Sequence, residues 1–402
     1  MIINENDINI GIETFWTKGG GIGGSIKSTP SDFEVREIWE DNLIVGENMV
    51  IPSKLNGLYL HFTLEKRGID TLQAIRILSR ILNHSINDFG YAGIKDGNAT
   101  TFQRISLWKG EKKEILKRIN KDSRIKIHSV SYGRYGIKLG GHWGNQFRLI
   151  IRDIPLKKEE LRKRLKILDQ ELRQKGKLIP NFFGSQRFGG TRLITHRVGR
   201  NILRREWKEA VMCYLCIPSP YETKSLFNAR KDLSETENFT DFQIQLQNQK
   251  RILTIEWIMT KHLLEKPNDW IGAIQKLNRK EISLFIGAYQ SLLFNKCLSF
   301  LIREFPEIAD IPSKIPLIGW KTNMDLFPNS IRSILNELLE NDRISLSDFK
   351  SQNRLFSSTG TQRDSFVKIS NFKTDFLGKH VKLQFSLPKG SYATVLLREI
   401  RK

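Results

Sequence analysis

The segment YAGIKDGNATTFQRIS, residues 91–106, joins a turn to a β-strand and carries an adjacent cation and carboxylate. Glycines on both sides of Lys95 and Asp96 tolerate tight or left-handed backbone, and residues 99–106 are rich in β-forming side chains. The pattern places the Asp96 carboxylate at the mouth of a strand, a position from which catalytic groups often act. A solvated turn, which Asp and Gly also favour, is the alternative interpretation of this segment taken alone.

The composition is that of a large, basic, globular chain. Its 402 residues are enough for two or three domains, and a hydrophobic content of 39% allows a sizeable core. Lys and Arg number 65 against 43 acidic residues, so the net charge is +22, which favours nucleic acid as the partner. An anionic membrane would require an amphipathic anchor or a lipidation motif, and we find neither. A charge that serves only solubility remains open.

The cysteines and the apolar segments indicate a reducing compartment. Cys213, Cys216 and Cys297 are too few for a disulfide framework, and the C-x-x-C pair lacks a second Cys/His pair at zinc-site spacing. The first residues have no signal-peptide pattern, and no apolar run approaches the length of a membrane span. We therefore expect a cytoplasmic protein, or a nuclear one if the source has a nucleus.

Strand patterns gather at both ends of the chain, and helix patterns dominate its middle. Residues 19–24 satisfy G-x-G-x-x-G, but the segment that follows contains Pro30 and opens no helix, so a dinucleotide loop is rejected. This distribution predicts an α+β domain interrupted by a mostly helical insertion. The pattern predicts strands at 33–38, 58–64, 99–106, 145–152, 381–387 and 392–400, helices at 71–83, 156–177, 194–216 and 279–303, a polar loop region at 217–250 and irregular structure at 306–360.

A second unusual segment, NFFGSQRFGG at 181–190, combines aromatic rings, amides, an arginine and glycines. Phe faces stack on bases and amides read base edges, although a Gly-rich turn with core Phe side chains explains the segment equally well. Arg197, Arg200 and Arg204 follow at helical spacing and share one face. That stripe is either a solvated surface or a set of phosphate contacts.

Six motifs, in one order over most of the chain, resemble those of the TruD family of tRNA pseudouridine synthases. Ser31 departs from the family pattern, which commonly has Glu there, outside the proposed catalytic positions. The motifs are A-G-x-K-D with a T-x-Q strand (92–96, Thr101, Gln103), K-x-x-P-x-D-F-x-V-x-E (27–37), N-x-F-G-x-Q-R-F-G (181–189), Q-S-x-x-F-N (290–295), P-L-x-G (316–319) and F-x-L-P-x-G-S-x-A-T…R-E (385–399).

The resemblance implies an enzyme that converts a uridine in RNA to pseudouridine without cofactor or metal. It implies Asp96 as the catalytic carboxylate and Lys27 as the cation that keeps it ionised, since burial alone would raise a carboxyl pKa. Lys95 should point to the opposite face of the extended segment. The base must leave its stack, and motif position makes substrate-binding candidates of Phe183, Asn181, Phe385, Arg187 and Gln186.

The implied fold is a mixed, largely antiparallel-sheet catalytic domain formed by both ends of the chain, with a family-specific helical insertion. We expect the catalytic domain at 1–205 and 356–402 and the insertion at 206–355. The expected partner is tRNA, most simply at uridine 13, with another structured RNA as the alternative substrate. We expect no membrane partner, and a monomer is favoured. Two alternatives stay open: a non-catalytic RNA binder or chaperone on this scaffold, and another RNA-modifying enzyme such as a methyltransferase.

Overall fold

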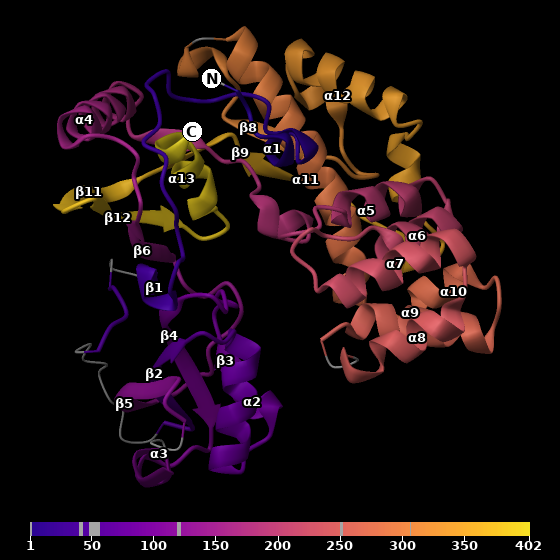
Figure 1. Cartoon of the computed structure of the whole chain (residues 1–402), viewed down its shortest axis with the longest axis horizontal. Coiled ribbons are helices and arrows are strands. Elements are labelled where there is room, and N and C mark those ends of the chain that lie inside the picture. Colours follow the sequence, from indigo (N-terminus) through magenta and orange to yellow (C-terminus); the bar gives the residue numbers. More distant parts are fainter. Residues whose placement is uncertain (1, 40–42, 48–56, 119–121, 250–251, 306) are drawn as a thin grey trace. The chain divides into compact units, whose positions relative to one another are not determined.

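The chain forms two compact units. The sheet unit comprises residues 17–179 and 367–402, and the helical unit comprises residues 1–16 and 180–366. Figure 1 gives the labels used below. The division into a catalytic domain and an insertion at 206–355 is a separate, functional one and stays a prediction. The computed structural model describes residues 2–39, 43–47, 57–118, 122–249, 252–305 and 307–402.

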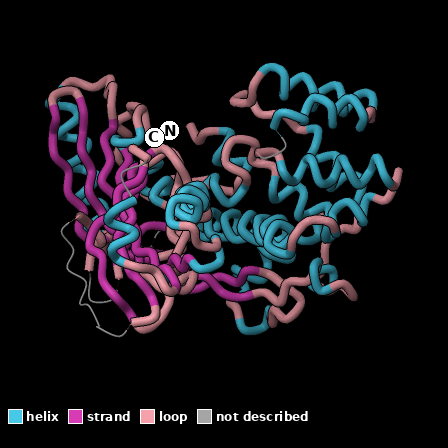
Figure 2. Tube along the Cα trace, turned by 90° about the horizontal axis from the view of Figure 1, so that it is seen from below, coloured by secondary structure: helices cyan, strands magenta, loops and turns pink. Residues whose placement is uncertain are grey.

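The sheet unit is built on one mixed sheet, whose strands run side by side in Figure 2. Among the described strands of this sheet, β1 and β4 pair in parallel and the other neighbouring strands pair antiparallel. The order is β11 (Ser370–Leu377), β12 (His380–Pro388), β6 (Gly144–Ile151), β1 (Phe33–Ile38), β4 (Thr100–Trp108), β2 (Tyr59–Arg67) and β5 (Ile125–Gly133), with β3 (Phe89–Tyr91) on β4. The predicted mixed, largely antiparallel sheet is confirmed.

Both ends of the chain contribute to this sheet, as the sequence predicts. Strand β6 pairs with β1 on one side, where Val35 is opposite Phe147, and with the C-terminal β12 on the other, where Phe385 is opposite Phe147. Because both partners bury alternate residues, three strands distant in sequence share one apolar face.

Helix α2 (Thr71–Leu82) packs against the sheet close to the candidate site. Asp70 accepts a hydrogen bond from the Gln73 backbone, and the Gln73 side chain accepts one from the Asp70 backbone, so the helix begins at a complete capping box. Its apolar stripe lies against the inner residues of β2 in one core cluster. The predicted helix at 71–83 is confirmed. The unit also contains α3 (Lys112–Arg118), α4 (Lys158–Gln174) and α13 (Ala393–Arg401).

The helical unit is organised around α11 (Arg279–Glu304), which confirms the predicted helix at 279–303. Helix α5 lies very close to it: a Cβ added at Gly199 would be 2.0 Å from the Phe285 carbonyl oxygen, so glycine is required there. Its other elements are α1 (Glu5–Asn9), α5 (Thr195–Leu203), α6 (Trp207–Cys216), α7 (Lys224–Thr236), α8 (Phe239–Leu246), α9 (Thr254–Glu265), α10 (Trp270–Gln275), α12 (Asn329–Asn341), and the paired strands β8 (Lys314–Leu317) and β9 (Thr361–Asp364). A short ladder joins β7 (Leu178–Pro180) and β10 (Phe366–Lys368).

Helix α11 also overturns one expectation from the sequence. Among the described helices, it alone is long and apolar enough to cross a membrane by length and composition. However, 78% of its most apolar window is buried inside the protein. Its apolar surface is therefore accounted for by the core of the helical unit.

Three predicted elements are wrong. Residues 392–400 form helix α13, because Ala393, Leu397 and Ile400 bury one helical face. Residues 217–250, predicted as loops, contain α7 and α8, whose N-caps are Thr223 and Asn238. The single helix predicted at 194–216 is two helices, α5 and α6, with Arg205 in the left-handed region between them.

Candidate active site

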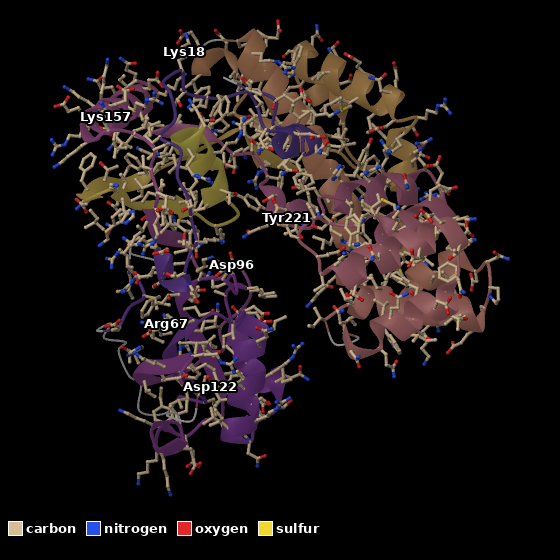
Figure 3. All side chains as sticks on the ribbon, viewed as in Figure 1. Lys18, Arg67, Asp96, Asp122, Lys157 and Tyr221 are labelled. Carbon is tan, nitrogen blue, oxygen red and sulfur yellow. The ribbon has the colours of Figure 1, made fainter. Side chains whose placement is uncertain are left out.

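Asp96 lies on the loop between β3 and β4, at the position labelled in Figure 3. The loop is held from several elements of the sheet unit. The ammonium group of Lys66 on β2 donates to the Asp96 carbonyl oxygen at 2.8 Å. Thr71, the first residue of α2, accepts a hydrogen bond from the Lys95 backbone N–H at 2.8 Å and donates to Gln103 on β4. The carboxylate is therefore displayed by an anchored loop, not by a freely solvated turn.

The side chains of the two adjacent charged residues have different surroundings, as the extended segment predicts. Lys95 is buried and forms an ion pair with Glu37 of β1 at 3.0 Å. Glu37 is fully buried and also accepts a hydrogen bond from the Arg104 backbone. Lys95 thus fastens the loop to the sheet, while the Asp96 side chain keeps 27% of its surface exposed.

Lys27 is the cation that contacts the Asp96 carboxylate, through an ion pair and hydrogen bond with Oδ2. The other carboxylate oxygen accepts from the Asn98 backbone N–H at 3.1 Å. The Lys27 ammonium also lies 4.4 Å from the centre of the Phe33 ring, a cation–π geometry. Lys27 has a φ of 59°, in the left-handed region that non-glycine residues rarely adopt, so the local fold imposes this conformation.

These contacts determine the ionisation of the carboxyl group. Burial acts to raise the pKa of Asp96, but the hydrogen bond and charge of Lys27, the Asn98 N–H and the charge of Lys66 together outweigh it. The pKa of Asp96 therefore lies below its usual value, and the group is a carboxylate at neutral pH. This is the state that attack on carbon or removal of a proton requires.

The segment that presents Lys27 is itself tied to the sheet. The buried carboxylate of Asp32 accepts two hydrogen bonds from the Arg152 guanidinium, at 2.6 and 2.9 Å. Pro30 begins a short 3-10 helix, and the Asp32 side chain accepts from the Thr29 backbone. In this motif, Lys27 is therefore the cation, Pro30 begins the turn that follows it, and Asp32 anchors that turn to the sheet.

Lys66 is a site residue that the sequence interpretation missed. Its side chain is fully buried and donates to the carbonyl oxygens of Ile69 and Asp96. Burial lowers the pKa of Lys66 to about 8, and the charges of Asp70 and Asp96 oppose that shift. A signal was present: Leu60, Phe62 and Leu64 alternate along the inner face of β2, and the next inner position is Lys66.

Lys66→Met is expected to lower kcat about 10- to 100-fold, because the Asp96 carbonyl loses its anchor and small displacements of a catalytic group are costly. The acid limb of the pH profile should move upward, since the charge of Lys66 also lowers the Asp96 pKa. Thermal melting should change little, because removing a buried charge offsets the two lost hydrogen bonds. The matched control is Lys126→Met, at an exposed position on β5. An equal loss of rate in both variants would contradict a positioning role for Lys66.

Phe385 lies in the sheet unit, in a row of aromatic rings that leads to Lys27. Its ring stacks on Phe147 at 5.3 Å, and Phe147 contacts the edge of Phe33, the ring beneath Lys27. Phe385 has no exposed surface in this structure. Phe385 therefore supports, through Phe147, the Phe33 ring that the Lys27 ammonium contacts. Its role as a wall of the substrate pocket stays a prediction.

The remaining predicted residues belong to the helical unit and meet there with motifs from later in the chain. Asn295 on α11 accepts from the Phe183 backbone N–H at 2.9 Å and donates to its carbonyl at 3.0 Å. The Arg363 guanidinium lies 4.0 Å above the Phe183 ring, and Phe294 packs against the ring at 5.5 Å. Phe183 is thus held in a buried, cation-covered position.

Asn181, Gln186 and Arg187 lie around the same motif. Asn181 is buried, accepts a hydrogen bond from Arg363 at 2.6 Å and donates to the Asp364 carbonyl. Arg187 donates to the Ser291 hydroxyl on α11, and Gln186 is exposed. The structure therefore brings together Asp96 and Lys27 in the sheet unit and places Asn181, Phe183, Gln186 and Arg187 in the helical unit.

Comparison with known proteins finds one family along most of the chain. The family described as tRNA pseudouridine synthase D (TruD) matches residues 9–313 and 307–400. A relative from Methanocaldococcus jannaschii, named "Probable tRNA pseudouridine synthase D 1", is 35% identical over 94% of this chain and 95% of that protein. One from Archaeoglobus fulgidus, named "Probable tRNA pseudouridine synthase D", is 33% identical over 98% of both chains.

A solved structure is similar as well. The crystal structure of a protein from Methanosarcina mazei, titled "Putative tRNA pseudouridine synthase D (TruD)", aligns with a TM-score of 0.77 and 29% identity, covering 100% of this chain and 98% of that one. The family match extends over both compact units and over each of the six motifs. The chain therefore belongs to the tRNA pseudouridine synthase D (TruD) family.

Proposed function

We propose that this protein isomerises a uridine of tRNA to pseudouridine, with Asp96 as the catalytic carboxylate. The observation that carries the proposal is the pairing of Asp96 with Lys27 on an anchored loop, which keeps a partly exposed carboxylate ionised. The family membership supplies the reaction class. The names of the relatives supply tRNA as the substrate.

The reaction breaks the C1′–N1 bond of the target nucleotide, turns the uracil and rejoins it to the ribose through C5. Asp96 serves this sequence beside the ribose, whether its oxygen attacks C1′ or removes the 2′ proton. Lys27 holds the carboxylate ionised in the partly desolvated site. The proton on C5 leaves when the new bond is complete, so its release reports turnover.

The uridine must leave its stack before its base can be turned. We propose that Phe183 covers the extruded base and that Asn181, Gln186 and Arg187 bind the nucleotide around it, with Phe385 supporting the other wall. Aromatic faces stack on bases, and amide and guanidinium groups match base edges and phosphates. We assign uridine 13 of tRNA as the target, as in the family that the chain resembles.

The test is the release of tritium from C5-labelled uridine in tRNA transcripts. We expect release from a transcript that contains uridine 13 and none from the matched transcript with cytidine at position 13. Release from both transcripts would keep the activity and overturn the target position. Tight binding with no release from any tRNA would contradict the proposed reaction and favour an RNA-binding or chaperone role.

A further inference from the structure

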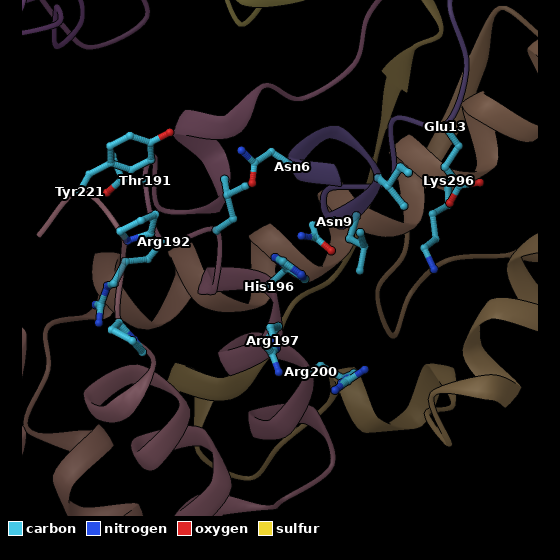
Figure 4. A pocket seen from close by; sticks show the side chains of 15 residues that line it. Asn6, Asn9, Glu13, Thr191, Arg192, His196, Arg197, Arg200, Tyr221 and Lys296 are labelled. Atoms are coloured by element: carbon cyan, nitrogen blue, oxygen red, sulfur yellow. The ribbon is translucent and has the colours of Figure 1, made fainter. Parts of the chain in front are cut away.

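A cavity of about 690 Å³ opens in the helical unit, and none of the residues assigned above to catalysis or to the base is among those that line it. Figure 4 shows its lining, which comes from α1, the loop after Gly190, α5 and α11. We propose that this cavity binds a nucleotide of the bound RNA through its phosphate, as a second RNA-contact site. The inference rests on the proposed function insofar as RNA is the substrate.

The cations on the cavity wall are only partly neutralised by the protein. Arg192 pairs with Glu256 at 3.2 Å, and Arg200 pairs with Asp342 at 3.1 Å. Within the part of the chain that the structure describes, Arg197 and Lys296 form no ion pair with a carboxylate. Two uncompensated cations on one concave surface attract a phosphate, because it relieves their mutual repulsion.

The single acidic side chain on the wall does not supply the missing charge. Glu13 is paired with Arg303 at 3.1 Å, and its backbone N–H donates to Ser299. The wall therefore keeps a net positive charge, which is the electrostatic condition for an anion site.

His196 supplies a buried polar group without a partner at the same wall. It is 7% exposed, its ring packs edge-on against Phe188, and its Nδ1 has no hydrogen-bond partner among the described residues. Burial and the neighbouring cations Arg197, Arg200 and Lys296 lower the pKa of His196 to about 4, so the ring is neutral. A buried polar atom without a partner points to a ligand or ordered solvent at that place.

Other residues of the wall fit a nucleotide better than a bare phosphate. Tyr221 is 74% exposed at the rim and offers a ring on which a base can stack. Asn6 and Asn9 bring amide groups from the α1 side. The volume lies within the range of sites that hold small organic ligands. Cations, amide groups and an exposed aromatic ring on one cavity wall together assign a nucleotide.

The test compares two double variants that remove equal charge from the same unit. Arg197→Gln with Lys296→Gln changes the cavity, and Arg279→Gln with Lys280→Gln changes exposed positions at the start of α11. We expect the cavity pair to weaken tRNA binding about tenfold and to reduce the slope of log K against log salt by about 1. The control pair should change binding by less than about twofold. Fluorescence anisotropy across a salt series measures both quantities, and circular dichroism verifies folding.

A second arm separates RNA from a free nucleotide as the source of the phosphate. Uridine 5′-monophosphate is titrated calorimetrically into wild type and both double variants without RNA. Strong binding of the mononucleotide that only the cavity pair loses, with tRNA affinity unchanged, would overturn the assignment to RNA. Equal losses of tRNA affinity in both pairs, or none in either, would overturn the site itself. Tritium release by the wild type is scored separately, so a failed reaction and a failed site give different results.

Discussion

Asp96→Asn should abolish tritium release from C5 of the target uridine, by a factor on the order of 10³ or more. Asparagine has nearly the same shape, and its oxygen can still accept from the Asn98 N–H. It has no charge, so it neither attacks C1′ nor removes the 2′ proton. Because the ion pair with Lys27 positions only this side chain, affinity for tRNA should remain within about threefold of wild type.

The matched control for this substitution is Asp375→Asn, at an exposed position on β11 of the same unit. It changes the same functional group and the same net charge, and its rate should equal that of wild type. Single-turnover kinetics with enzyme in excess separates a chemical defect from slow product release. Substantial turnover by Asp96→Asn, with the fold verified by thermal melting, would show that Asp96 is not the catalytic carboxylate.

The central part of this site was predictable because each motif residue has a local physical role. Lys27 pairs with Asp96, Asp32 binds Arg152, and Glu37 binds Lys95. The motif of residues 27–37 was recognised from the family resemblance, which also suggested Lys27 as the partner of Asp96, whereas the partners of Asp32 and Glu37 became known only from the structure. The role of Asp96 in catalysis remains a prediction that kinetics must test.

Other contacts of the site were not predicted, because no pattern in the sequence names the partner of each residue. Asn295 holds Phe183 across 112 residues, and Arg363 binds Asn181 across 182 residues. Motif order along the chain does not reveal that these residues fold into the helical unit with α11 and β9. The spacing of residues along the sequence indicates which of them share one face of a helix or strand. Which residues of different elements come into contact depends on the topology of the fold.

The error at residues 392–400 arises because a short apolar run is compatible with both the two-residue period of a strand and the 3.6-residue period of a helix. Residues 392–400 contain Val395, Leu396 and Leu397 in succession, so alternation and helical spacing both fit. Tertiary packing decides in favour of the helix, since the buried Glu399 accepts hydrogen bonds from the backbone and hydroxyl of Thr17. In residues 217–250 the polar content reflects exposed helix faces, not loops.

Lys27→Met should lower kcat about 10²- to 10³-fold and bring an acidic limb into the measurable pH range. In wild type, burial raises the Asp96 pKa, but Lys27, the Asn98 N–H and the charge of Lys66 together outweigh it, so the carboxylate is ionised across pH 5–8. Removing Lys27 removes the hydrogen bond and the charge that contribute most to lowering the Asp96 pKa. Burial should then raise this pKa above its ordinary value. Activity of Lys27→Met should therefore fall as the pH drops below about 6, whereas wild type should show no such limb.

The pH dependence of folding stability gives an independent measurement, because acidification should lower the stability of wild type and raise that of Lys27→Met relative to it. In wild type the Asp96 pKa is depressed, so its contribution to stability is present above the unfolded pKa and is lost as the pH falls through the folded pKa. In Lys27→Met the raised pKa makes the ionised form destabilising at neutral pH, and acidification should stabilise the variant relative to wild type.

Lys157→Met, at an exposed position before α4, is the matched control and should behave as wild type in both experiments. Lys27→Arg keeps the charge and should remove the acidic limb even where its rate is low. A flat pH profile for Lys27→Met would reassign the cation, and the buried Lys66, which already donates to the Asp96 carbonyl, would be the first candidate.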